Sequence, residues 1–201
     1  TAILSNAQAG LRFLAQDPPD IADLREILQD VVRDNKRASA VINGLRTMLR
    51  RQETEREQID IGTCVQEVVD LMHSDFLERG VDVTQSIAPG CVVLGDKGQL
   101  QQVVLNLAMN ANEAMTEQPR ESRALHVSVA PSDGRRVRVA VTDSGPGVDE
   151  AHIIKVFDHF FTTKANGLGM GLAMCRSILE AHGGTLDAER NQGRGLTFHF
   201  V

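Results

Sequence analysis

Two glycine-rich loops about twenty residues apart constrain this chain more than any other feature of its sequence. The first, Asp143-Ser-Gly-Pro-Gly147, follows the alternating apolar positions Val137, Val139 and Val141, which predict a strand. The second, Gly167-Leu-Gly-Met-Gly171-Leu172, opens an apolar helical run. Glycine allows a positive φ and a close approach of backbone to ligand, and the start of a helix presents N–H groups to an anion. The second loop is therefore predicted to cradle phosphate groups.

The first loop places a carboxylate, Asp143, at the end of the predicted strand beside Gly145 and Gly147. A carboxylate accepts hydrogen bonds, so it can receive one from the amino group of a base. Taken alone, an Asp-x-Gly sequence is as typical of a plain turn as of a binding site. In front of a phosphate-binding loop, it is a candidate for reading adenine.

The segment between the loops holds three of the chain's seven phenylalanines, Phe157, Phe160 and Phe161, followed by Thr162-Thr163-Lys164. An aromatic cluster is commonly part of a core, and a glycine loop commonly only starts a helix. The order and spacing of all three features together favour a nucleotide site over these structural alternatives.

A helix is predicted from Asp96 onward, with Gln99 three residues later as a capping box. One stripe of this helix is apolar, and the stripe roughly opposite carries Asn106, Asn110 and Glu113. Because the helix is apolar on nearly all sides, its asparagines are expected to be buried, where an amide must be bonded. They serve either to tie down neighbouring loops or to build a site.

In this order, the motifs resemble those of the catalytic and ATP-binding domain of sensor histidine kinases, which has the Bergerat fold shared with gyrase, mismatch-repair and chaperone ATPases. Residues 106–114 resemble the asparagine box, 143–147 the first glycine box, 157–164 the phenylalanine box and 167–172 the second glycine box. One departure is His159, which stands where the family usually has proline. The segment between the two glycine loops, which is expected to act as a lid, should therefore turn more loosely there.

The resemblance implies ATP and Mg²⁺ as cofactors, with Asn106 and Asn110 holding the metal and Lys164 adding positive charge at the catalytic site. Amide oxygens, retained waters and substrate phosphates are the ligands that Mg²⁺ prefers. The role of Glu113 stays open. The residues implied to bind the nucleotide are Asp143, Gly145, Gly147, Phe157, Phe161, Thr162, Thr163, Lys164, Gly167, Leu168, Gly169, Met170, Gly171 and Leu172.

The first 58 residues predict two helices joined by the break Asp17-Pro-Pro-Asp20. The first helix, 1–15, has Leu4, Ala7, Leu11 and Leu14 on one stripe. The second, 21–56, has the heptad spacing of a coiled-coil seam. An antiparallel hairpin with an exposed seam needs a second hairpin to cover it, which predicts a homodimer with a four-helix bundle. The seam positions are Leu24, Leu28, Val31, Asn35, Ala38, Ile42, Leu45 and Leu49.

The two helices of this hairpin differ in length, at about 54 Å and 23 Å for a rise of 1.5 Å per residue. The last seam residues of the second helix would then have no facing partner, so we expect the first helix to be cut by roughly twenty residues. The resemblance implies that the missing piece carries the phosphoacceptor histidine, because the sequence from Thr1 resembles the segment that comes directly after the family's histidine box.

The fold class predicted for the whole chain is α+β, with a helical hairpin domain at 1–58 and an ATP-binding catalytic domain at 59–201. The resemblance implies that the second is an α/β two-layer sandwich of the Bergerat type. Its predicted helices are 63–78, 96–115 and 171–181, and its predicted strands are 59–61, 81–87, 91–94, 125–130, 135–142, 185–189 and 196–201. His182, beside two glycines, is expected to close a helix end rather than to do chemistry.

Composition limits the partners and the compartment. The net charge is −6, and residues 59–201 carry twelve basic and eighteen acidic groups. An acidic domain cannot attract ATP by a global field, so local groups must hold the anion, and nucleic acid is not expected as a partner. No run of eighteen apolar residues occurs, so no membrane contact is expected of this segment. Three scattered cysteines are expected to be buried free thiols, as in a cytoplasmic protein, while membrane anchoring of the parent stays open.

We therefore expect the kinase core of a two-component sensor, which transfers the γ-phosphoryl of ATP to a histidine upstream of this chain and then to an aspartate of a response-regulator receiver domain. Two alternatives are a dimeric scaffold that binds nucleotide without transfer, and a Bergerat-fold ATPase. Hydrolysing relatives commonly have a glutamate base where this chain has Asn106, which disfavours the second alternative. The upstream sequence discriminates the kinase from the scaffold.

Overall fold

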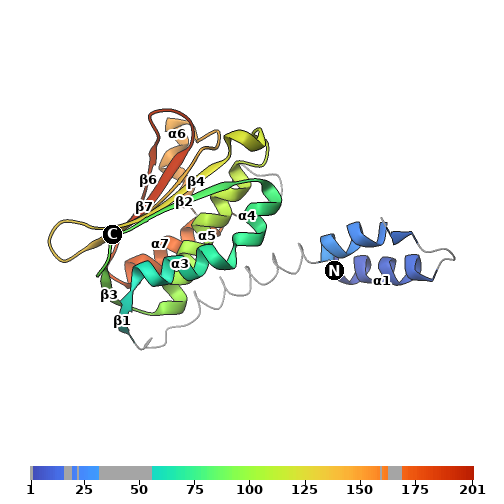
Figure 1. Ribbon diagram of the computed structural model, residues 1–201, viewed down its shortest axis with the longest axis horizontal. Coiled ribbons are helices and arrows are strands. Elements are labelled where there is room, and N and C mark those ends of the chain that lie inside the picture. Colours follow the sequence, from blue (N-terminus) through green and yellow to red (C-terminus); the bar gives the residue numbers. More distant parts are fainter. Residues whose placement is uncertain (1, 16–19, 22, 32–55, 159, 163–168) are drawn as a thin grey trace. The chain divides into compact units, whose positions relative to one another are not determined.

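The computed structural model describes residues 2–15, 20, 21, 23–31, 56–158, 160–162 and 169–201. By its contacts, the chain divides into two compact units, Thr1–Arg51 and Gln52–Val201. Figure 1 shows both units. Within the described part of the chain, no helix combines the length and apolar character needed to cross a bilayer.

The first unit contains α1 (Ala2–Leu14) and a second helical stretch over residues 21 and 23–31. The second stretch starts at Asp20, whose Oδ1 accepts a hydrogen bond from the N–H of Asp23 at 3.1 Å. The two helices contact each other at Gly10, where an added Cβ would lie 3.4 Å from Ile27 and 3.5 Å from Leu24. This contact confirms the predicted hairpin. Residues 32–55 of the predicted second helix lie outside the described residues, and its predicted last residue, Arg56, is not helical.

The apolar stripe predicted on α1 does not face the second helix. Leu4, Leu11 and Leu14 are more than half exposed, whereas Gly10 is buried and Phe13 half-buried. The physical reason is that Gly10, which has no side chain, allows the closest approach of the two backbones, so the hairpin contact centres on it. The predicted stripe is therefore left on the outside of the single hairpin.

The second unit is built on a five-stranded sheet with the strand order β2-β4-β5-β7-β6. Only the β2–β4 pair is parallel, and the other neighbours are antiparallel. A separate two-stranded sheet pairs β1 with β3. The strands are β1 (Glu57–Asp60), β2 (Asp82–Ile87), β3 (Val92–Gly95), β4 (Ala124–Pro131), β5 (Val137–Asp143), β6 (Leu186–Arg190) and β7 (Leu196–Phe200).

Four helices cover one face of the five-stranded sheet, which makes the unit a two-layer α/β sandwich (Figure 1). The helix α5 contacts α3, α7 and β5, so it lies at the centre of the helical layer. Val103, Val104, Leu107 and Ala108 of α5 are completely buried. The helices are α3 (Ile61–Leu71), α4 (His73–Arg79), α5 (Lys97–Ala114) and α7 (Gly171–Ala181), with the short α6 (Glu150–Ile153) and the 3₁₀ turns Arg120–Ser122 and Lys155–Phe157.

The predicted helix over 63–78 is wrong as a single element, because the chain breaks it at Met72 (φ −89°, ψ 0°) into α3 and α4. The predicted strand 59–61 also starts earlier and ends earlier, since Asp60 is the N-cap of α3 and its Oδ1 accepts the N–H of Thr63 at 3.0 Å. Ile61 is therefore helical. The other predicted elements within the described residues of this unit agree with the structure to within two residues at each end.

Candidate functional site

Asp143 is the last residue of β5 and its side chain is only 5% exposed. The N–H of Gly145 donates a hydrogen bond to Asp143 Oδ1 at 2.8 Å. Burial raises the pKa of the Asp143 carboxyl, and the N–H groups of Gly145 and Leu196 partly offset that rise. The structure thus places a buried, oriented carboxylate where the sequence predicts the base-reading group.

Gly145 brings this loop against the C-terminal end of α5. A Cβ at residue 145 would lie 2.8 Å from Asp143 Oδ1 and 3.3 Å from the Cβ of Ala114, so a larger residue could not occupy the position without movement. Gly147 has φ +74°, a conformation that side chains other than glycine rarely adopt. Gly147 is therefore required by its backbone conformation, and Gly145 by the close side chains of Asp143 and Ala114.

Two residues of the β6–β7 turn contact Asp143, and the sequence reasoning missed both. Asn191 Nδ2 donates a hydrogen bond to the Asp143 carbonyl oxygen at 2.9 Å. A Cβ at Gly195 would lie 1.8 Å from the same oxygen, so the β6–β7 turn packs directly against Asp143, the last residue of β5. The sequence signals only a turn between two strands here, because the contact joins segments 48 residues apart.

The amides of α5 are less buried than predicted. Asn106 and Asn110 are half-buried, and Glu113 is exposed. The fully buried amide is Asn112, at 5% exposure, and its Oδ1 has no hydrogen-bond partner among the described residues. Asn106 and Asn110 lie one turn apart and so share a helix face, as a joint metal site requires.

Asn106 is held in place by neighbours on two helices. Its Oδ1 accepts a hydrogen bond from Gln102 Nε2 at 3.3 Å, and its Nδ2 contacts Cys175 Sγ of α7 at 3.6 Å. Burial raises the pKa of the Cys175 thiol to about 12, so this group is neutral at physiological pH. The three cysteines are buried and free, as the sequence predicts.

The aromatic segment between the glycine loops packs against the domain at two points. The Phe157 ring meets Phe198 edge-on, with ring centroids 6.2 Å apart, and the Arg176 guanidinium lies 5.9 Å from the Phe157 centroid. The Phe161 ring lies 5.8 Å from His152. The Phe157 contacts tie the segment to β7 and α7, whereas the Phe161–His152 contact lies within the segment between the two loops.

The second glycine loop meets this segment at Gly169. The N–H of Phe160 donates to the Gly169 carbonyl oxygen at 2.9 Å, and a Cβ at Gly169 would lie 2.4 Å from the carbonyl carbon of Phe160. Both residues have a positive φ, +63° for Gly169 and +67° for Phe160. A left-handed conformation is uncommon for an aromatic residue and marks a local constraint.

Gly171 is the first residue of α7, and nothing in the described chain lies within 4 Å of a Cβ added there. The flanking Met170 and Leu172 are half-buried. The space beside position 171, at the first turn of α7, is therefore open although its neighbours are partly covered. Unpaired N–H groups and the positive end of the helix dipole meet at such a turn. Of the predicted nucleotide residues, Thr163, Lys164, Gly167 and Leu168 lie outside the described residues, as does His159.

His182 closes α7, as the sequence predicts, and it also joins two helices. Its Nδ1 donates to the Ile178 carbonyl oxygen at 2.8 Å, which leaves Nε2 to accept the N–H of Asp96 at 3.1 Å. Asp96 is the N-cap of α5, and its Oδ1 accepts the N–H of Gln99 at 2.9 Å. The His182 ring therefore takes the place that the Gln99 side chain would have in a full capping box.

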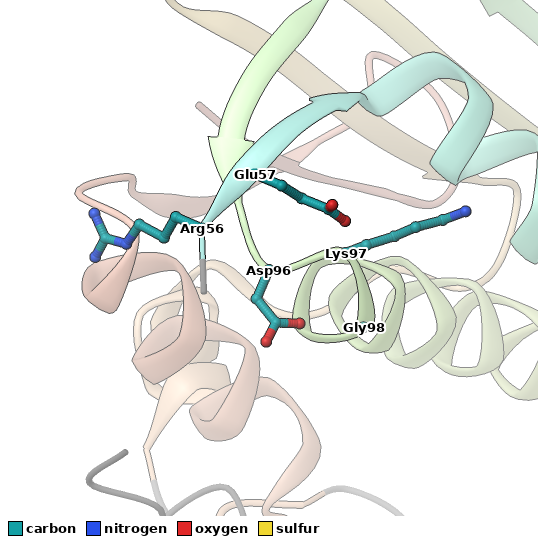
Figure 2. A pocket seen from close by; sticks show the side chains of 5 residues that line it. All are labelled: Arg56, Glu57, Asp96, Lys97 and Gly98. Carbon is teal, nitrogen blue, oxygen red and sulfur yellow. The ribbon is translucent and has the colours of Figure 1, made fainter. Parts of the chain in front are cut away.

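A polar pocket of about 550 Å³ lies at the N-terminal end of α5 and is lined by Arg56, Glu57, Asp96, Lys97 and Gly98 (Figure 2). Its two cationic groups are engaged within the protein, since Lys97 Nζ lies 2.8 Å from Glu67 and Arg56 donates to the Ala181 carbonyl at 2.6 Å. Gly145 contacts the opposite end of this 18-residue helix, about 27 Å away at 1.5 Å per residue. The pocket contains none of the predicted nucleotide residues.

Comparison with known protein families gives a match over residues 95–201 to the family described as histidine kinase-, DNA gyrase B-, and HSP90-like ATPase. The sensor histidine kinase TmoS of Ectopseudomonas mendocina is 36% identical over 98% of this chain and 21% of its own length. The sensor protein FixL of Bradyrhizobium diazoefficiens is 36% identical over 100% of this chain and 40% of its own length. The chain thus spans about a fifth to two fifths of these relatives.

Solved structures are similar as well. The catalytic domain of the histidine kinase ThkA is 31% identical, with a TM-score of 0.66 over 73% of this chain and 94% of that domain. Full-length ShkA in complex with AMPPNP is 26% identical, with a TM-score of 0.73 over 97% of this chain and 42% of that protein. The similarity to ShkA extends across both units of the sequence.

Proposed function

From the membership of this chain in the histidine kinase-, DNA gyrase B- and HSP90-like ATPase family, we propose that it is the kinase core of a sensor histidine kinase that binds Mg-ATP. The observation that carries the proposal is the buried carboxylate of Asp143, held at the end of β5 beside the C-terminal end of α5. The open first turn of α7 at Gly171 supports it. Asp143 would bind the adenine base, and the phosphates would lie over the first turn of α7 at Gly171.

The residues present suit a magnesium ion bridged to phosphates. Asn106 and Asn110 offer amide oxygens on one face of α5, and a carbonyl oxygen has two lone pairs, so Asn106 Oδ1 can keep its bond from Gln102. Mg²⁺ prefers such oxygen ligands together with phosphates and waters. When bound, the ion supplies charge neutralisation at the transferring phosphoryl group, to which Lys164 would add.

The reaction proposed is transfer of the γ-phosphoryl to a histidine upstream of this chain, and from there to an aspartate of a response-regulator receiver domain. Phosphoryl transfer depends chiefly on positioning and on charge neutralisation, which is what this site offers. All six histidines of the chain lie between residues 73 and 199, outside the helical hairpin. Hydrolysis is the weaker alternative, because the amide of Asn106 cannot act as a general base.

A homodimer through the hairpin completes the proposal. The outward apolar residues of the first unit are each more than half exposed in the single chain, and burying them against a second hairpin would be favourable. They are Leu4, Leu11, Leu14, Ile21 and Leu28. A cytoplasmic location fits the expected partner, a receiver domain.

Titration calorimetry with ADP and a non-hydrolysable ATP analogue tests the nucleotide site. Asp143→Asn should weaken both nucleotides, because it replaces half of the acceptor carboxylate by a donor amide. Asp187→Asn, the same change at an exposed position of β6, serves as the matched control. Undiminished binding by Asp143→Asn would contradict the assignment of Asp143 to the base.

A further inference from the structure

We infer that Asn191, in the turn between β6 and β7, is a positioning residue that sets the orientation of the Asp143 carboxylate and thereby the preference for adenine. The inference rests on the proposed function, in which Asp143 reads the base. Asn191 lies outside the asparagine, phenylalanine and glycine boxes in the sequence and meets the first glycine box through the backbone carbonyl of Asp143.

Asn191 extends the hydrogen bonding between β5 and β7 by one residue beyond their last backbone pair. The pairing of β5 with β7 ends at Thr142 opposite Thr197. Beyond that pair, Gly195 lies against the Asp143 carbonyl oxygen, so closely that a Cβ there would be 1.8 Å away. The side-chain amide of Asn191 donates to this oxygen at 2.9 Å, in place of a backbone N–H of the neighbouring strand.

The second step is that the direction of the bonds around Asn191 is fixed. Its Nδ2 faces two carbonyl oxygens, those of Asp143 at 2.9 Å and Arg194 at 3.1 Å, and only an NH₂ group can donate to both. Its Oδ1 therefore accepts the hydroxyl of Thr197 at 2.7 Å. The Thr142 hydroxyl must in turn donate to Thr197 Oγ1, 2.9 Å away. An isosteric aspartate at 191 cannot satisfy this chain of bonds.

The third step links the carbonyl to the carboxylate. The peptide unit after Asp143 is held on its other side by Ser144, whose N–H donates to Ala124 O at 3.1 Å. One residue further, the N–H of Gly145 donates to Asp143 Oδ1. Releasing the Asp143 carbonyl lets this peptide unit rotate, and the rotation moves the N–H of Gly145, one of the two N–H groups that bond the carboxylate. Asn191 thus acts on the base through Asp143 and never touches it.

The consequence concerns base choice rather than affinity in general. Adenine offers an amino donor at its position 6, whereas hypoxanthine carries a carbonyl acceptor there, which a carboxylate repels. A site that hydrogen-bonds one group rejects the analogue that lacks it, provided that the acceptor is held in position. A carboxylate of Asp143 that is less firmly held therefore binds the amino group of ADP more weakly. Its affinity for IDP should not fall, because IDP offers no amino group at this position.

The test compares the dissociation constants of ADP and IDP by calorimetry for the wild type, Asn191→Asp, Thr197→Val and Asp143→Asn. The neighbouring exposed Gln192→Ala is the matched control. Asn191→Asp should weaken ADP by roughly three- to tenfold, the worth of one net hydrogen bond, and leave IDP unchanged. Thr197→Val keeps the shape and removes one link of the chain, so it should lower the ADP preference by about two- to threefold.

The possible outcomes distinguish a failure of the role of Asn191 from a failure of the base-reading role of Asp143. If Asn191→Asp and Thr197→Val weaken ADP and IDP by the same factor, or weaken neither, Asn191 has only a structural role and the inference is wrong. If Asp143→Asn leaves the preference for ADP unchanged, the proposed base-reading role of Asp143 itself fails. A lost preference in Asp143→Asn with an intact preference in both other variants overturns only the role of Asn191.

Discussion

His182, at the end of α7, accepts a hydrogen bond from the backbone N–H of Asp96, the N-cap residue of α5, at 3.1 Å. The ring fits because residue 95 is a glycine, where an added Cβ would lie 2.8 Å from His182 Cδ2. One end of the helix that begins at Gly171 is thereby fixed to the start of the helix that carries Asn106 and Asn110.

This contact predicts that His182→Ala destabilises the second unit by about 1–3 kcal/mol, because it leaves the N–H of the helix N-cap residue Asp96 without its partner. Gly95→Ala should also destabilise, through the clash with the ring. Denaturant unfolding followed by circular dichroism measures both. His73→Ala, on an exposed histidine, is the control, and equal stabilities of His182→Ala and this control would refute the bridging role.

The raised pKa of Asp143 predicts opposite effects of pH on stability and on nucleotide binding. The folded state holds the Asp143 proton more tightly than the unfolded chain, in which the pKa is near 3.8. The stabilising contribution is therefore full below 3.8 and is lost as the pH rises through the raised value. Binding of ADP should strengthen over the same interval, because the ionised carboxylate is the better acceptor.

Thermal unfolding without ligand and calorimetry with ADP, both recorded between pH 4 and 7, measure these two trends on the side of 3.8 to which the pKa of Asp143 is raised. Asp143→Asn should remove the pH-dependent difference in both. A wild-type stability and affinity that rise together with pH in this interval, with the same rise in Asp143→Asn, would show that other groups control both.

The sequence predicted the parts of the site whose signal is local. Asp96 caps α5 as expected, Gly147 has the positive φ that favours glycine, and Gly145 leaves no room for a side chain beside Asp143 and Ala114. Asn191 and Gly195 could not be predicted, because their roles depend on the register of β5 against β7, and nothing within the turn itself encodes the contact with Asp143.

Helical periodicity was also insufficient in two places. On α1 it predicted the stripe through Leu4 and Leu11 as the packed face, but the contact with the second helix is made at Gly10, and close backbone approach is not a hydrophobic signal. On α5 it predicted buried amides at 106 and 110, but the buried amide is Asn112. A helix that is apolar on nearly all sides does not show which side faces the larger part of the core.

The two glycines of the second loop should respond differently to alanine. At Gly169 a Cβ would collide with the backbone of Phe160 and Phe161, and φ is +63°, so Gly169→Ala should both destabilise the domain and weaken nucleotide binding.

At Gly171 a Cβ meets nothing in the described chain, so Gly171→Ala should keep the melting temperature of the free protein and weaken the binding of ATP. Differential scanning fluorimetry with and without ATP analogue separates the two, and undisturbed ATP binding by Gly171→Ala would exclude phosphate from this turn.

The metal assignment predicts a specific loss at α5. Asn110→Ala should reduce the Mg²⁺ dependence of ATP-analogue binding more than binding without Mg²⁺, because its amide oxygen is proposed to meet only the cation. Asn112→Leu on the same helix removes a buried amide with an unpartnered oxygen and should keep the Mg²⁺ dependence. Calorimetry in Mg²⁺ and in EDTA measures the difference, and equal losses in both buffers for Asn110→Ala would remove it from the metal site.

The chain should bind Mg-ATP and yet form no acid-labile phosphohistidine on itself. Its six histidines all belong to the ATP-binding unit, and two of them have structural roles, in the bonds of His182 to Ile178 and Asp96 and of His126 to Thr84. In-line transfer needs an acceptor presented to the γ-phosphoryl, and a helical hairpin carrying a histidine, supplied in trans, should provide it. Labelling with γ-labelled ATP, followed by acid treatment, measures both reactions. Acid-labile label on the 201-residue chain alone would show that one of its own histidines is the acceptor.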